Sequence, residues 1–118
     1  MRILIGAMAL AVLAGCSSVS EIRGTQPVLE ISSGRSAKGV AECIRDGWQA
    51  TPLVGGSVGG ILQQSGEQYS VVAPNTESPW HVVDIKPAGS GSTIRYHFYR
   101  SWQSPPDKVT SVVKACSS

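Results

Sequence analysis

Two amphipathic helices, one on each side of a strand-forming region, most limit how this chain can fold. The first is predicted over residues 36–50, with Ser36 at its N-cap and Thr51-Pro52 at its end. Its apolar residues recur at spacings of three and four, as they do on one face of a helix. They are Val40, Cys43, Ile44, Gly47 and Trp48.

The second helix is predicted near the C-terminus. Ser104-Pro105-Pro106-Asp107 combines a serine cap, prolines in the first turn and an acidic residue at the positive end of the helix dipole. Apolar residues then repeat at positions i, i+3, i+4 and i+7, so this helix also needs a surface on which to bury one face. They are Val109, Val112, Val113 and Cys116.

Four β-strands are predicted between the helices, at residues 58–64, 68–73, 80–86 and 92–102. A turn at 65–67 and loops at 74–79 and 87–91 join them in sequence order. The predicted fold class is α+β: helix, four-stranded antiparallel meander, helix, forming a two-layer sandwich with both helices on one face of the sheet. Residues 55–60 are rich in glycine but match no phosphate-binding motif, so they are predicted to be a flexible connector.

The N-terminus has the pattern of a cleavable secretory signal. Arg2 precedes an unbroken apolar run at residues 3–13, which is too short for a permanent transmembrane helix of roughly 20 residues. Behind it, Leu13-Ala14-Gly15-Cys16 resembles the lipobox of bacterial lipoproteins. The resemblance implies cleavage before Cys16, a diacylglycerol on the Cys16 thiol and further acylation such as palmitate. The alternative is an ordinary signal peptide with Cys16 incidental.

The resemblance also implies an address and a domain organisation. Because Ser17, and not Asp, follows the cysteine, the chain is similar to small proteobacterial lipoproteins of the cell outer membrane, facing the periplasm. Residues 1–15 would be the signal peptide, 16–35 the lipidated N-terminus and a tether, and 36–118 a single α+β domain. Alternatively, residues 28–31 form an edge strand that shortens the tether.

Cys43 and Cys116 are the two cysteines that remain after lipidation of Cys16. In an oxidising compartment a pair of cysteines favours a disulfide bond. Each lies on the apolar face of a predicted helix, so both point towards one core, and the predicted bridge would join the two helices. The alternatives are two free thiols or a metal pair.

The charge of the mature chain argues against nucleic acid as a partner. The chain has 10 Lys and Arg against 8 Asp and Glu, and Arg2 is removed with the signal peptide. The remaining basic residues are spread singly, whereas phosphate binding requires clusters of them.

His81 and His97 are the only histidines. If residues 87–91 form the loop, Lys86 pairs with Ser92 and His81 lies opposite His97 on the outward sheet face. Zinc sites use three or four protein ligands and no third ligand accompanies this pair, so we expect two surface histidines, no metal and no cofactor. Neither a nucleophile elbow nor a pair of catalytic carboxylates is present, so we expect no enzyme activity.

The outward face of the predicted sheet has the composition of a protein-binding patch. The residues assigned to it are Val83, Ile85, Arg95, His97 and Tyr99. The alternative is that a third layer, such as residues 28–31, covers this face. The favoured function is a lipid-anchored, non-enzymatic interaction or accessory module that binds an envelope protein. The alternative function is a periplasmic enzyme inhibitor or immunity protein acting through residues 74–79.

Overall fold

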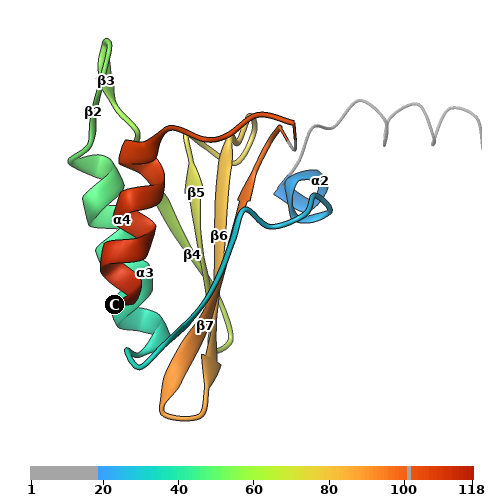
Figure 1. Cartoon of the computed structure of the whole chain (residues 1–118), viewed down its shortest axis with the longest axis vertical. Coiled ribbons are helices and arrows are strands. Elements are labelled where there is room, and N and C mark those ends of the chain that lie inside the picture. The colour runs from blue at the N-terminus through green and yellow to red at the C-terminus, as the bar shows by residue number, and fades with distance from the viewer. Residues whose placement is uncertain (1–18, 101) are drawn as a thin grey trace, which may run out of the picture.

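The computed structural model describes residues 19–100 and 102–118. The predicted signal peptide and Cys16 therefore lie outside the described residues. The fold is α+β, with a mostly antiparallel sheet and two longer helices on one of its faces (Figure 1). The elements are α2 (Val19–Arg23), β1 (Leu29–Ser33), α3 (Ala37–Gln49), β2 (Pro52–Leu53), β3 (Gly56–Ser57), β4 (Ile61–Ser65), β5 (Gln68–Ala73), β6 (His81–Ala88), β7 (Gly91–Phe98) and α4 (Asp107–Ser117).

The main sheet has five strands in the order β1-β7-β6-β5-β4. Strands β4 to β7 form an antiparallel meander that roughly matches the predicted one, and β1 adds a fifth strand beside β7. Gly91 permits the close approach of β1, because a Cβ at this position would collide with the carbonyl oxygen of Ser33. The prediction of a tether through residue 35 is therefore wrong for residues 19–33, and the edge-strand alternative is confirmed.

Helices α3 and α4 pack side by side on one face of the sheet. The Ser36 hydroxyl caps α3 by accepting a hydrogen bond from the amide of Gly39, as predicted. Gly47 lets the helices approach closely, because a Cβ there would lie 2.6 Å from Cγ1 of Val112. The predicted disulfide between Cys43 and Cys116 is present and joins the two helices.

The start of α4 differs from the prediction. The helix begins at Asp107 and its N-cap is Pro106, whose backbone is extended with ψ at 140°. Ser104 makes no cap, because it lies two residues too early, and the prolines precede the first turn instead of occupying it. The indole Nε1 of Trp48 on α3 donates to the carbonyl of Val109 at 3.1 Å and fixes the first turn of α4 from the side.

The β6–β7 hairpin is paired one residue away from the predicted register. His81 lies opposite Phe98 and Val82 lies opposite His97. The turn contains only Gly89 and Ser90, because β6 continues through Pro87 to Ala88. Pro87 is tolerated since β5 has already ended beside it. A shift of one residue moves every β6 side chain to the opposite face of the sheet.

Candidate functional site

The predicted partner-binding patch does not exist as one surface. Val83 and Ile85 are fully buried in the core beneath the helices, so their assignment to the outward face is wrong. The cause is the one-residue shift of the hairpin. Arg95, His97 and Tyr99 do lie on the opposite face, but Arg95 is bound to Glu30 of β1 and His97 is buried.

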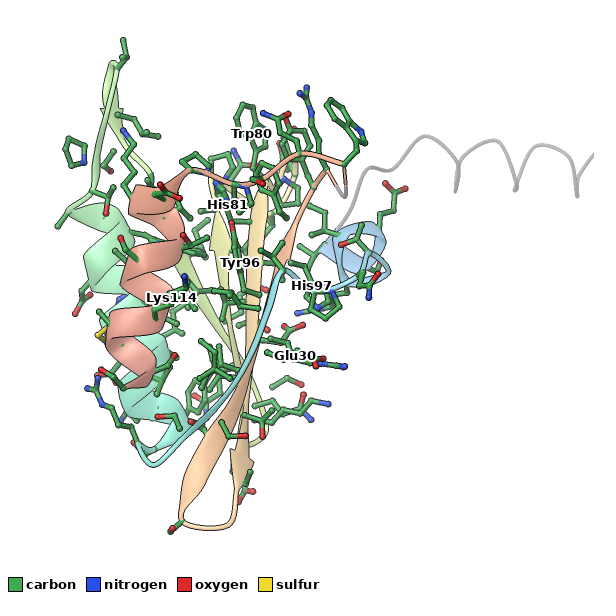
Figure 2. All side chains as sticks on the ribbon, viewed as in Figure 1. Glu30, Trp80, His81, Tyr96, His97 and Lys114 are labelled. Carbon is green, nitrogen blue, oxygen red and sulfur yellow. A yellow bond between two sulfur atoms is a disulfide. The ribbon has the colours of Figure 1, made fainter. Side chains whose placement is uncertain are left out.

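The two histidines lie on opposite faces of the sheet, and neither is at the surface (Figure 2). The His81 Nδ1 and the Tyr96 hydroxyl are 2.7 Å apart in the layer between sheet and helices. Burial lowers the pKa of His81 from 6.5 to about 4 and raises the pKa of Tyr96 above its ordinary value, so both groups are neutral at pH 7. The Nδ1 of His97 donates to the carbonyl of Thr25 at 3.0 Å. The predicted cross-strand pair of surface histidines is therefore wrong.

Helix α2 covers part of the outward face. Ile22 is buried against Val72 and Val82, forming a second, smaller apolar cluster. The Nε and Nη2 of Arg23 donate to the carboxylate of Asp84 at 2.9 Å, and the Ser70 hydroxyl donates to the same carboxylate at 2.7 Å. Another part of this face is a groove lined by polar and charged residues. Its lining residues are Arg23, Gln63, Gln64, Ser65, Gln68, Ser70, Asp84 and Lys86.

The free side of β4, which we call the open edge, has no element of the main sheet beyond it. The strand Ile61-Leu62-Gln63-Gln64-Ser65 contains no charged residue and no proline. Four of its five residues are exposed. Proteins usually protect an exposed edge with charge, proline or a covering segment. The open edge lacks the first two devices.

A second unusual surface lies where β6 begins and β7 ends. The indole of Trp80 stacks on the ring of Tyr99, with the ring centroids 5.0 Å apart. The guanidinium carbon of Arg100 lies 4.7 Å from the Tyr99 ring and 5.1 Å from the Trp102 ring. Trp80 is 51% exposed and Trp102 is 77% exposed. We call Trp80, Tyr99, Arg100 and Trp102 the aromatic end.

The β2–β3 hairpin extends the aromatic end. Of the residues predicted to be a flexible connector, Gly56 and Ser57 instead form β3, which pairs with Leu53 and Pro52 of β2. Leu53 lines a small apolar pocket together with Trp80 and Phe98. Val54 at the hairpin tip is fully exposed. The hairpin projects beyond the main sheet at the end where α4 begins (Figure 1).

The predicted register concealed the aromatic end, because pairing His81 with His97 places Trp80 on the same sheet face as Tyr96. One signal was available: Pro79 directly precedes Trp80, and Pro105 and Pro106 follow shortly after Trp102, so both tryptophans lie at strand ends. Tryptophans outside strand ends have no core to fill. The open edge was present in the prediction as the first strand of the meander, but its exposure was not recognised.

The described residues contain neither a group of metal-ligating side chains nor a helix that could span a membrane. Within residues 19–100 and 102–118, no three His, Cys, Asp or Glu side chains converge on a point that could hold a metal ion. No helix in the same part of the chain has the length and apolar character needed to cross a bilayer. The sequence matches no protein-family model, and comparisons with curated proteins and with solved structures find no significant similarity.

Proposed function

We propose that this chain is a lipid-anchored, non-enzymatic protein of the outer membrane, facing the periplasm, that binds another envelope protein through the open edge. The observation that carries this proposal is the open edge itself: an exposed strand without charge or proline. An extended segment of a partner can add to such an edge through main-chain hydrogen bonds. The lipobox-like Leu13-Ala14-Gly15-Cys16 supports the anchor.

The two edges of the sheet favour β4 as the binding strand. The other edge strand, β1, packs against α4, carries the charged Glu30 and follows Pro27. These are features that discourage strand addition. Strand β4 has a helix over only one of its faces, and its other face borders the polar groove.

The buried titratable groups support a non-enzymatic role. His81 is neutral and packs among aromatic rings, and although it lines the small apolar pocket beside Leu53 and Trp80, it is only 6% exposed. The carboxylate of Asp84 is neutralised by Arg23 and is occupied by two hydrogen-bond partners. The Ser70 hydroxyl beside Asp84 has Asp84 and Arg23 as its partners, and no histidine in the described part of the chain is placed to activate it as a nucleophile.

A proline in the open edge tests this function. In a hairpin with a two-residue turn, the residues next to the turn exchange hydrogen bonds, so the amides of Leu62 and Gln64 point away from β5. Gln64→Pro therefore leaves the β4–β5 ladder intact but removes an amide from the free side. Gln64→Ala is the matched control, because it also loses the side-chain bond to the Gly66 carbonyl but keeps the amide.

The measurement is cross-linking in cells followed by capture of the full chain tagged after Ser118. We expect one envelope protein to be captured with the wild type and with Gln64→Ala but not with Gln64→Pro. Equal capture by all three would remove the open edge from the proposal. A Cys16→Ser variant reports lipidation through its altered mobility and its loss from the membrane fraction.

A second candidate function, a periplasmic inhibitor or immunity protein, is favoured by the order of the loop at residues 74–79. The side chain of Asn75 accepts hydrogen bonds from the amides of Glu77 and Ser78, while Pro79 is buried. Pre-organised exposed loops lose little entropy on binding an enzyme. Inhibition assays against muramidases and secreted toxins test this function. Asn75→Ala should weaken any inhibition, and no inhibition across the panel would count against this candidate.

A further inference from the structure

The aromatic end has the chemistry of a surface that rests in the headgroup region of a bilayer. Tryptophan and tyrosine are enriched at membrane–water interfaces, because each combines a large apolar ring with a polar tip. Here two exposed tryptophans flank a tyrosine and an arginine, and an exposed valine at the β2–β3 tip projects from the same end. Exposed aromatic groups of this size need an explanation in a chain of 118 residues.

The length of chain before α2 brings the anchor to this end. Only Ser17 and Ser18 separate Cys16 from Val19, and three steps of extended chain span at most about 11 Å. Val19 packs against the cluster of Ile22, Val72 and Val82, and Tyr99 packs against the same cluster. Tyr99 in turn stacks on Trp80. A lipid on Cys16 would therefore hold the membrane surface close to the aromatic end.

We propose that the aromatic end lies on the phospholipid surface of the membrane, with Trp80 and Trp102 in the headgroup region. This inference rests on the proposed lipidation of Cys16 and adds to it a fixed orientation of the domain. The domain is thus held at two points, the lipid and the aromatic end. The open edge runs along β4, whose Ser65 end lies at the opposite end of the sheet from Trp80, and it stays available to a partner.

Charge contributes little to this contact. Arg100 and Lys108 are the basic residues near the aromatic end, and Lys108 is bound to the carbonyl of Pro52 in the hairpin. Glu77 in the neighbouring loop and Asp107 at the start of α4 oppose them. The sum of these charges is zero, so the contact depends on ring burial. It should therefore persist when salt is raised from about 0.1 M to about 1 M, which shortens the screening length from about 10 Å to about 3 Å.

Tryptophan fluorescence of the full acylated protein tests the orientation. The protein is reconstituted in vesicles of phosphatidylethanolamine and phosphatidylglycerol, with or without bromine near the headgroup end of the acyl chains. Because two of the three tryptophans are exposed at the aromatic end, we expect brominated lipid to quench about half of the emission. Trp48 is fully buried in the core and serves as the unquenched internal control.

Matched variants assign the quenched signal. Trp102→Ser removes a 77% exposed ring without touching the core, and Trp80→Ser removes the stacked ring. Each should lower the amount of quenched emission about twofold relative to the wild type, because the exposed signal comes from two rings. Circular dichroism verifies that both variants are folded. A photoreactive amino acid at position 102 then identifies the neighbour in cells. A phospholipid adduct is expected, whereas a single protein adduct would assign the aromatic end to a protein partner and overturn the inference.

The outcomes separate this inference from the proposed function. If the wild type is acylated and bound to vesicles but none of its emission is quenched, the anchor stands and the orientation is wrong. If the wild type and Cys16→Ser have the same mobility and neither binds membranes, the lipid anchor is wrong and the orientation is rejected with it.

Discussion

On one face of the sheet, α3 and α4 bury a continuous core and are tied together by a disulfide, whereas on the other face the five residues of α2 cover two valines. The first face contains nearly all of the fully buried side chains, including Trp48 and Tyr96. The second depends on Ile22 and on the ion pair between Arg23 and Asp84. The helix-covered face thus determines the fold, and the other face determines how the domain is connected to its N-terminus.

The largest effect should come from the disulfide on the helix-covered face. It closes a loop between residues 73 apart in sequence, so its removal in a Cys43→Ala/Cys116→Ala double variant should lower the free energy of unfolding by about 4 kcal/mol. Urea denaturation measures this loss. A loss below about 1 kcal/mol would show that packing alone holds the two helices together.

Acidification should weaken the same face through His81. The pKa of this residue is about 4 in the folded protein and 6.5 in the unfolded chain, so the unfolded chain binds the proton first as the pH falls. Above pH 6.5 the neutral His81 makes its full contribution to the free energy of unfolding. As the pH falls from 6.5 to about 4, up to about 3 kcal/mol of that contribution is lost. Denaturation of His81→Gln over this range should show a smaller pH dependence than the wild type. Equal slopes would mean that His81 does not carry the effect.

The same substitution on each face gives the sharpest comparison. Ile44 is fully buried in the main core and Ile22 is 6% exposed beneath α2. Ile44→Ala should cost about 3 kcal/mol and Ile22→Ala about 2 kcal/mol, because the site of Ile22 can collapse by moving one short helix. Equal losses by chemical denaturation would mean that the faces do not differ.

The smallest effect is expected at the ion pair. Arg23→Ala should lower the free energy of unfolding by less than about 1 kcal/mol, since Arg23 is partly exposed. Hydrogen exchange should nevertheless become faster at Ile22 and neighbouring amides of α2, with no change in α3. Uniform exchange rates in both helices would show that α2 does not open separately.

The elements with strong local signals could be predicted from the sequence. The serine cap and the apolar period of residues 36–50 predicted α3 correctly, and the position of each cysteine on a helix face predicted the disulfide. In contrast, α2 is only five residues long and has two apolar positions, Val19 and Ile22, that meet their partners only in the folded sheet. Its structure comes from long-range contacts, which no local pattern contains.

The candidate site was less predictable because it depended on one turn. Proline normally ends a central strand, so Pro87 was assigned to a loop, and this choice shifted the register of β6. The shift exchanged the faces of Val83 and Ile85 with those of Val82 and Asp84. It also concealed the exposure of Trp80. The usual exclusion of proline from a central strand does not apply at Pro87, because β5 is shorter than β6.

The short connection between Cys16 and α2 also has a mechanical consequence. If Cys16 carries the proposed lipid, a force that a partner applies to the domain would reach the anchor through α2 and the two residues before it. The first contacts to bear the load are the buried side chain of Ile22 and the hydrogen bonds of Arg23. When they yield, the next resistance is the ladder of β1 on β7. The domain would therefore lengthen in two steps under tension, first at α2 and then at the edge of the sheet.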